Sequence, residues 1–159
     1  MNSRLKIGKA WCLGDKSEMK IYTIGFTKKT LEEFIKRLKR AEVQRIIDIR
    51  LNDASQLSGF AKSPDLAFIL KQFGIEYISI KSLAPDKALL DKYKKDKNWK
   101  EYEANFKALM NARNAKKTLN DLQLDKKTSC FLCSEDKPER CHRRLVAEML
   151  DKNFEIVHL

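Results

Sequence analysis

The sequence lacks the features by which several large protein classes are recognised. No apolar run approaches the roughly 20 residues of a membrane-spanning helix, and no segment resembles a secretion signal. It contains no internal repeat, zinc finger or arginine-glycine motif. No glycine-rich phosphate loop follows Gly25 and no serine occupies a nucleophile elbow, which disfavours ordinary dinucleotide binding. These absences predict a cytoplasmic protein without membrane contact, whose four cysteines are reduced.

Length and composition predict a single folded domain. The 159 residues include 43% hydrophobic and 35% charged side chains, which excludes a disordered chain. A domain of this size needs no disulfide or metal for its stability. Residues 1–18 show no clear periodicity, so we expect a poorly patterned extension there. Residues 19–159 are expected to form the single α/β domain.

The chain is strongly basic. Lys and Arg number 33 against 22 Asp and Glu, which gives a net charge of +11 and a pI of about 9.5. This surplus favours an anionic partner, either a phosphate-bearing small molecule or a nucleic acid. The alternative is that the lysines cover solvated helix faces, as expected for Lys36 and Lys92. Nothing in the sequence specifies an oligomeric state or a cofactor.

Hydrophobic periodicity predicts alternating strands and helices from residue 19 onward. Short segments that are apolar and rich in β-branched residues are typical of buried parallel strands. The expected strands are Lys20–Ile24, Arg45–Ile49, Ile75–Ile80, Thr128–Cys133 and Glu155–Val157. Helices are expected between them, consecutively over residues 83–124. The pattern predicts an α/β fold with a mostly parallel, Rossmann-like open sheet and helices on both faces.

Short polar motifs predict where three helices begin. Thr30 and Glu33 form a capping box for the first helix. Ser63 is the expected N-cap of the second helix. The last helix is expected over Pro138–Lys152, capped by Asp136. Its first amides and the positive end of its dipole would then form an anion site.

Polar residues at the strand ends form the predicted site, because ligands bind beyond the carboxyl ends of the strands in open α/β sheets. Arginine can hold phosphate through two hydrogen bonds, and carboxylates or an imidazole can transfer protons. The expected ligand-binding residues are Gly25, Thr27, Arg50 and Arg143, and the expected catalytic residues are Asp48, Glu135 and His142. The alternatives are a structural ion pair between Asp48 and Arg50, and a pairing of His142 with Glu135.

The cysteines near the end of the chain raise two further hypotheses. Cys130 and Cys133, followed by Cys141 and His142, suggest zinc ligands. Residues three apart in a strand point to opposite faces, however, so no metal is expected. Cys133 at a strand end and Cys141 near a helix start are candidate nucleophiles or redox thiols, because a helix dipole lowers the pKa of a thiol. Burial against the sheet is the alternative for both.

Many of these residues also match the pattern of a known family. The matching segments are Thr23-Ile24-Gly25, Asp48-x-Arg50, Leu51-Asn52, Ser55 to Phe60, Leu83-Ala84-Pro85, Trp99 with Tyr102, Cys133-x-Glu135 and Cys141-His142-Arg143. Over Met19–Leu159 the chain resembles the bacterial and archaeal family called domain of unknown function 488. The resemblance implies a compact α/β domain with a polar site at the matched residues, Ser55 among the ligand-binding ones, and no established reaction. The chain departs from the pattern at Asp53, where relatives often carry Asn, and near Lys81 and Ser82, where they often carry Pro.

Arginine, histidine and carboxylate side chains at one rim of the sheet favour an enzyme. We expect a hydrolase or transferase that acts on a phosphate-bearing ligand, such as a nucleotide or nucleic acid. The specific geometry expected is one phosphate held jointly by Arg50 and Arg143. A non-catalytic nucleic-acid-binding module is the first alternative, because of the net charge, and a thiol-redox protein is the second.

Overall fold

The structure is a computed structural model that describes residues 19–54 and 59–159. Its five strands form one sheet in which every pairing is parallel. The strands are β1 (Met19–Gly25), β2 (Arg45–Asp48), β3 (Glu76–Ser79), β4 (Ser129–Cys133) and β5 (Phe154–His158), in the order β3-β2-β4-β1-β5. Every expected strand is present with its ends within one residue of the predicted ones. The predicted α/β open sheet is confirmed.

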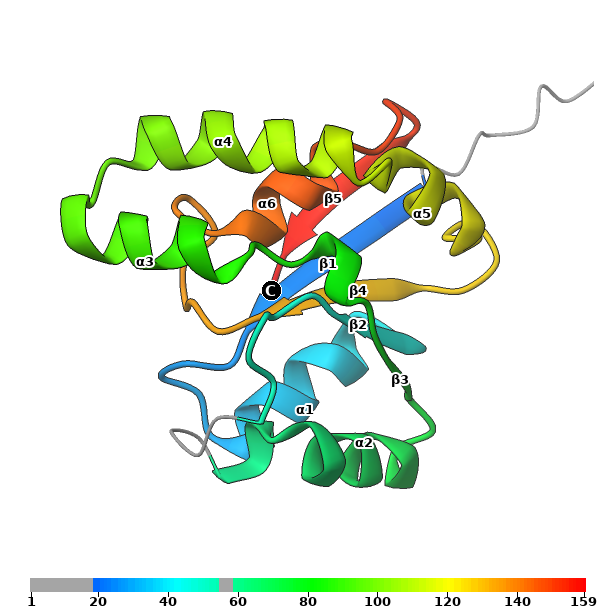
Figure 1. Cartoon of the computed structure of the whole chain (residues 1–159). Coiled ribbons are helices and arrows are strands. Elements are labelled where there is room, and N and C mark those ends of the chain that lie inside the picture. The colour runs from blue at the N-terminus through cyan, green and yellow to red at the C-terminus, as the bar shows by residue number, and fades with distance from the viewer. Residues whose placement is uncertain (1–18, 55–58) are drawn as a thin grey trace, which may run out of the picture.

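Helices cover both faces of this sheet. They are α1 (Leu31–Arg40), α2 (Ser63–Gln72), α3 (Lys87–Asp96), α4 (Trp99–Ala112), α5 (Ala115–Asp121) and α6 (His142–Ala147), with the short 3-10 helices η1 (Gly59–Ala61) and η2 (Lys81–Leu83). The helices α1 and α2 lie on one side of the sheet and α3 to α6 on the other (Figure 1). Within the described residues, no helix combines the length and the apolar character needed to cross a membrane.

Alternation along the central strand β4 divides the core into two layers. Successive side chains of a strand point to opposite faces. Cys130 and Leu132 pack with Phe34 in the layer under α1 and α2. Phe131 packs with Phe106 in the layer under α4 and α6. All five residues of β4 are buried, because helices cover both faces of the sheet. Such a strand carries apolar side chains on both of its faces.

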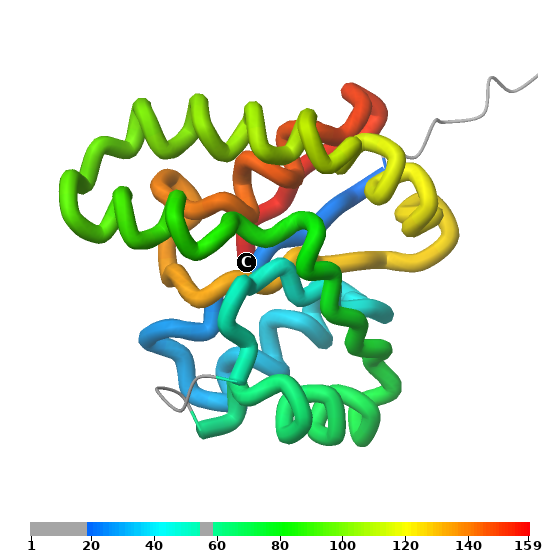
Figure 2. Tube along the Cα trace, in the orientation of Figure 1, coloured from blue at the N-terminus to red at the C-terminus, as the bar shows by residue number. Residues whose placement is uncertain are grey.

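The strand order creates a crevice at one end of the sheet. The helices α1 and α2 carry the chain from β1 through β2 to β3 on one face. The chain then returns over the other face, β4 enters between β2 and β1, and α6 follows on that second face. Neighbouring strands whose next helices lie on opposite faces leave a crevice beyond their carboxyl ends. The loops after β1, β2 and β4 all lie at this end (Figure 2).

The predicted starts of the first two helices are correct to within one residue. The Thr30 hydroxyl accepts a hydrogen bond from the Glu33 amide at 3.1 Å, which confirms the N-cap of α1. The N-cap of α2 is Lys62 rather than Ser63, because Lys62 has the extended backbone of a cap and Ser63 is already helical. After α2, Gly74 has φ 71°, the left-handed conformation that glycine adopts without steric cost.

The last predicted helix is wrong in its start and its length. It was expected over Pro138–Lys152, but α6 has only six residues, begins at His142 and has no side-chain bond at its N-cap, Cys141. Asp136, the expected cap, instead forms an ion pair with Lys29 at 2.7 Å. The segment before α6 is irregular, so the anion site predicted at the start of a long helix is not formed.

The layer under α1 and α2 provides a test of the packing. We expect Phe34→Ala to lower the free energy of unfolding by about 3–5 kcal/mol, because this fully buried ring leaves a cavity in the core. The matched control is Phe68→Ala on α2, where the ring is 66% exposed and the expected change is within about 0.5 kcal/mol. Urea denaturation of both variants measures the difference. Equal effects would contradict the packing described here.

Candidate active site

A cavity of about 290 Å³ opens at the carboxyl ends of β2 and β4. Its walls come from the loop after β2, the residues from Cys133 to Glu135, the start of α6, and the α3–α4 helix pair. It therefore lies in the crevice that the strand order creates. Concave sites that combine apolar walls with a few polar groups are the usual binding sites of small ligands. This cavity is the first candidate for the functional site.

Three reactive side chains meet on one wall of the cavity. Cys133 comes from the end of β4, and Cys141 and His142 come from the start of α6. Their ligand atoms all lie within 4.8 Å of one another. The three residues are 4%, 2% and 7% exposed, so they are shielded from bulk water although they border the cavity. We refer to Cys133, Cys141 and His142 as the thiol–imidazole cluster.

The imidazole of His142 has one orientation that satisfies both of its nitrogens. Its Nε2 lies 2.8 Å from the carbonyl oxygen of Ile49. A carbonyl oxygen only accepts, so Nε2 carries the hydrogen and Nδ1 of the neutral ring has the lone pair. Nδ1 lies 3.6 Å from Sγ of Cys133. Phe106 packs against the ring, with 5.6 Å between the ring centres. The fold therefore fixes both the tautomer and the ring plane.

The two thiols of the cluster differ in how readily they ionise. A hydrogen bond from the Cys141 thiol, together with the amides of Glu135 and Ser134, lowers the pKa of Cys133 despite its burial. Burial raises the pKa of Cys141, and so does the hydrogen bond to Cys133, because Cys141 must keep its proton to donate it. Burial also raises the pKa of Cys130, which lies on the opposite face of β4. Cys133 is therefore the favoured thiolate among the described cysteines.

Arg143 is fully buried and holds the loop that follows β4. It donates hydrogen bonds to the carbonyl oxygens of Glu135 and of Asp136, the latter at 2.9 Å. Its Nε also lies 3.3 Å from the hydroxyl oxygen of Thr23. The guanidinium group that was expected to bind phosphate therefore donates its hydrogen bonds to main-chain and hydroxyl oxygens of the protein. In the structure Arg143 positions the loop beside the cavity instead.

Gly25 and Thr27 join the ends of β1 and β4, rather than reaching the cavity. A Cβ atom on Gly25 would lie 1.6 Å from the carbonyl oxygen of Glu135, so only glycine permits this approach. The Thr27 hydroxyl donates to the carbonyl oxygen of Ser134 at 2.6 Å, and the Thr27 amide donates to the same oxygen at 3.1 Å. Both residues were expected to contact a ligand, and both make internal contacts that fix the loop.

Asp48 and Arg50 form the structural ion pair that was the alternative hypothesis. They are 0% and 3% exposed, and Nη2 of Arg50 lies 2.5 Å from Oδ2 of Asp48. The Tyr77 hydroxyl donates to the same carboxylate at 2.6 Å. Burial and this hydrogen bond raise the pKa of Tyr77. Because its oxygens are already hydrogen-bonded and have no access to solvent, Asp48 has no means of acting as the catalytic base expected from the sequence.

The two arginines expected to share a phosphate lie on opposite sides of the sheet. Arg50 packs against the Phe26 ring, 5.1 Å from its centre, in the layer of α1 and α2. Arg143 reaches from α6 to Thr23 on the other face. Arg50 also lines the cavity, but its donors are bonded to Asp48, and those of Arg143 are bonded to main-chain oxygens. The expected phosphate site between them is therefore not formed.

Of the two remaining residues that the sequence predicted for the site, only one can be placed at the cavity. Glu135 is exposed and lines the cavity, whereas Ser55 lies outside the described residues. Asp53 forms an ion pair with Lys81 at 2.8 Å, and Lys81 also donates to the Arg50 carbonyl oxygen at 2.9 Å. These are positions at which the chain departs from the family pattern described above. In this chain the two side chains pair across the loop after β2.

Aromatic and basic side chains form the wall opposite the cluster; of these, only Trp99 and Tyr102 were singled out in the sequence, as part of the family pattern. Trp99 and Tyr102 stack with 5.1 Å between ring centres and 26° between ring planes. The Tyr93 ring centre lies 4.9 Å from that of Tyr102. The cations lining the same cavity are Arg50, Lys94, Lys97 and Arg140. Aromatic residues at helical spacing usually belong to the hydrophobic core. The neighbouring lysines are the feature that distinguishes this aromatic wall from an ordinary core cluster.

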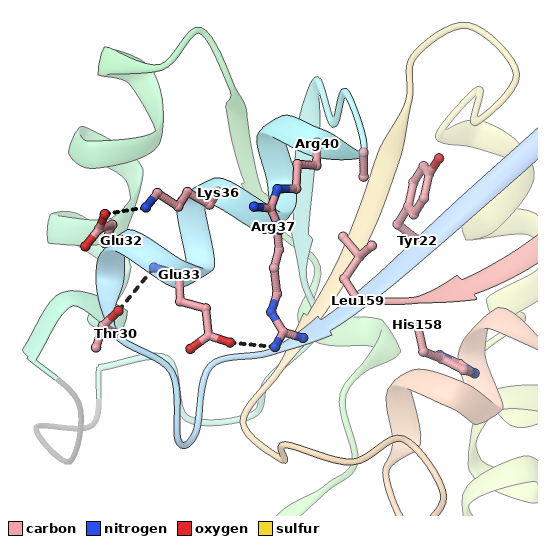
Figure 3. Close-up of a pocket in the computed structure, with 10 residues that line it drawn as sticks. Tyr22, Thr30, Glu32, Glu33, Lys36, Arg37, Arg40, His158 and Leu159 are labelled. Atoms are coloured by element: carbon pink, nitrogen blue, oxygen red, sulfur yellow. Dashed lines mark hydrogen bonds and ion pairs between the residues drawn. The ribbon is translucent and has the colours of Figure 1, made fainter.

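A second, wider hollow of about 710 Å³ lies between α1 and the end of β5 (Figure 3). Four of its charged side chains form two ion pairs along α1. Lys36 lies 2.5 Å from Glu32, and Arg37 lies 2.5 Å from Glu33. Paired, exposed charges on an open surface offer little to a ligand. This hollow is not a candidate active site.

Comparison with known proteins identifies the family. The family model described as "Domain of unknown function DUF488" matches residues 30–150, most of the chain. The chain belongs to the DUF488 family. The match includes the whole thiol–imidazole cluster, in agreement with the resemblance seen in the sequence. Comparison with curated proteins and with solved structures finds no match.

In this DUF488 protein the cluster can support two kinds of chemistry. As a thiolate, Cys133 can attack a bound ligand, with His142 as proton acceptor and the Ile49 carbonyl orienting the imidazole. Alternatively, two sulfurs and one imidazole nitrogen can bind a metal ion. Cys130 and Cys133 lie on opposite faces of β4, as expected from the alternation of side chains along a strand. Cys133, Cys141 and His142 nevertheless come together, because the loop after β4 returns to the end of that strand.

The close approach at Gly25 gives a direct test of the loop position. We expect Gly25→Ala to lower the free energy of unfolding by at least about 1–3 kcal/mol, because backbone atoms rather than a flexible side chain must move. Gly59→Ala is the matched control, since a Cβ there meets nothing within 4 Å. Urea denaturation measures both. A Gly25→Ala protein as stable as the control would show that the loop lies elsewhere.

The buried ion pair gives a second test, which separates a structural role of Arg50 from a ligand-binding one. We expect Arg50→Ala to cost about 3–5 kcal/mol of unfolding free energy, because the Asp48 carboxylate remains buried without its partner. Arg37→Ala removes an exposed ion pair on α1 and should cost less than about 1 kcal/mol. Thermal and urea denaturation compare the two. Unchanged stability of Arg50→Ala would contradict the structural role.

Proposed function

We propose that this DUF488 protein is an enzyme, a hydrolase or transferase, that binds a phosphate-bearing ligand of the nucleotide class in the 290 Å³ cavity. One observation carries the proposal: a reactive cluster and an aromatic, cationic wall border the same cavity. The thiol–imidazole cluster is the reactive centre of this enzyme, and Glu135 is an exposed carboxylate on the same cavity. The protein acts in the cytoplasm, where thiols remain reduced.

The aromatic wall supports a ligand with a flat ring. Trp99 is partly exposed and stacks on Tyr102, and Tyr93 meets its ring edge-on with 5.7 Å between ring centres. Stacking of a nucleobase on such side chains contributes about 1–3 kcal/mol per base and depends little on base identity. The cavity volume is near the lower end of the range of small-ligand sites, about 300–1,000 Å³. A mononucleotide fits this size better than a polymer.

The cations support a ligand that also carries phosphate. Lys97 ends α3 with a left-handed backbone, and its ammonium lies 5.9 Å from the centre of the Tyr93 ring. Among residues 19–54 and 59–159, Lys94 forms a single long ion pair, with Asp91 at 3.9 Å. Arg140 lies across the cavity, before α6. A base stacked near Trp99 would therefore have cations on both sides of its phosphate.

Nucleotide binding is tested with a fluorescent ADP carrying a methylanthraniloyl label on the ribose. We expect saturable binding that weakens about tenfold or more in the double variant Lys94→Ala/Lys97→Ala, because charge-assisted hydrogen bonds to phosphate contribute roughly 1.5–3 kcal/mol each. The matched control is Lys116→Ala/Lys117→Ala on α5, which has the same net charge. Fluorescence anisotropy at several salt concentrations measures affinity.

Two outcomes would contradict the proposal. One is the absence of binding for ADP and for unlabelled nucleoside mono-, di- and triphosphates used as competitors. The other is an equal loss of affinity in both double variants, because only the general charge would then matter. Turnover of the bound nucleotide, followed by phosphorus NMR, decides between an enzyme and a binding protein.

A non-catalytic nucleic-acid-binding module is the second candidate, because of the net charge of +11. Its signature is a steep fall of oligonucleotide affinity with salt, since several bound phosphates release counterions. A single phosphate group gives a much shallower dependence. Tight, strongly salt-dependent binding of a single-stranded oligonucleotide without nucleotide binding would favour this second function.

A further inference from the structure

We propose that Cys133, Cys141 and His142 form a Zn²⁺ site whose fourth coordination position faces the cavity. No metal was expected from the sequence, because Cys130 and Cys133 point to opposite faces of β4. The structure confirms that separation and nevertheless brings three other ligand atoms together within 4.8 Å. The convergence depends on the irregular loop before α6, which returns Cys141 and His142 to the end of β4.

The distances match a tetrahedral zinc site. With Zn–S near 2.3 Å and Zn–N near 2.0–2.1 Å, tetrahedral angles place a sulfur and a nitrogen ligand about 3.5 Å apart. The distance from Cys133 Sγ to His142 Nδ1 is 3.6 Å. The same geometry places two sulfurs about 3.8 Å apart, and the sulfurs of Cys133 and Cys141 lie within 4.8 Å of each other. Small rotations of the side chains therefore suffice for one ion to replace the thiol protons.

The groups around the cluster are those that support metal ligands. A ligating histidine typically donates its other ring N–H to a carbonyl or carboxylate, which fixes the tautomer. His142 does so through Nε2 and the Ile49 carbonyl oxygen at 2.8 Å, which leaves Nδ1 as the ligand atom. This arrangement is the one expected for a histidine that binds a cation.

The ligand set indicates the metal and the type of site. Two thiolates and one imidazole favour zinc over Mg²⁺ or Ca²⁺, which prefer oxygen ligands. Among the described residues, no fourth Cys, His, Asp or Glu contributes a ligand atom to the cluster. Three protein ligands and one open position are typical of catalytic rather than structural zinc sites. All three ligand residues line the cavity, so the open position faces it.

Zinc at this position also specifies the chemistry of the hydrolase or transferase, a step that rests on the proposed function. Bound Zn²⁺ lowers the pKa of its water ligand to about 7 and polarises oxygen atoms of a substrate. The water or substrate oxygen would occupy the fourth position, beside the nucleotide. Metal binding itself requires only the cluster, because two thiols release their protons to solvent as the ion binds.

The test measures metal directly, in reduced full-length protein stripped with a chelator. Titration with Zn²⁺ against a chromophoric chelator should give one equivalent bound with submicromolar affinity. X-ray absorption at the zinc edge should give two sulfur neighbours near 2.3 Å and lighter neighbours near 2.0–2.1 Å. The second measurement uses the unaltered protein, so it does not depend on whether any variant folds.

Variants assign the ligands. We expect Cys133→Ser and Cys141→Ser to weaken zinc binding by about a hundredfold or more, since loss of an outer hydrogen bond alone costs about 10–100-fold. Cys130→Ser is the matched control, because it removes a buried thiol of the same strand on the opposite face. It should retain one equivalent of zinc at unchanged affinity. Circular dichroism of each metal-free variant confirms folding.

Three results would overturn the zinc site. They are the absence of a bound equivalent in the reduced protein, an absorption spectrum with one or no sulfur neighbour, and an equal loss of affinity in Cys130→Ser. A disulfide between Cys133 and Cys141 that reforms and excludes zinc under reducing conditions would also overturn it. ADP binding is measured separately on metal-free protein. A failure of the zinc site therefore does not decide nucleotide binding, and a failure of nucleotide binding does not decide the zinc site.

Discussion

The contact on which the site depends most is the close approach between β1 and the loop after β4. Gly25 permits the Glu135 carbonyl to lie where any side chain would collide with it, and buried Arg143 holds that carbonyl in place. This fixes the amides of Ser134 and Glu135 against Cys133. It also aligns the start of α6 so that the His142 imidazole reaches the carbonyl oxygen of Ile49, the residue directly after β2.

Two buried arginines serve the two faces of the sheet in different ways. Arg50 is paired with the carboxylate of Asp48, so its charge is neutralised locally. Arg143 instead bonds carbonyl and hydroxyl oxygens, which satisfy its donors without neutralising its charge. That positive charge lies near Cys133 and contributes to the lowered pKa of its thiol. A residue that positions the loop therefore also favours the thiolate form.

The cavity joins segments that are distant in the chain. The α3–α4 pair supplies the aromatic and basic wall, and the β4–α6 connection supplies the thiol–imidazole cluster. They meet because both lie on the same face of the sheet, where the chain returns after β3 to place β4 between β2 and β1. The strand order thus brings a binding surface and a reactive centre together at one point.

The sequence by itself determined the strands, the N-cap at Thr30 and the end of the sheet at which polar residues gather, because these follow from local periodicity and backbone propensity. It left open whether Asp48 and Arg50 pair. Only the tertiary structure decided that they do, that Arg143 is buried away from ligands, and that Cys141 and His142 return to Cys133. Such outcomes depend on where an irregular loop crosses a neighbouring strand. That path is set by long-range contacts, at Gly25 above all, which no local pattern in the chain encodes.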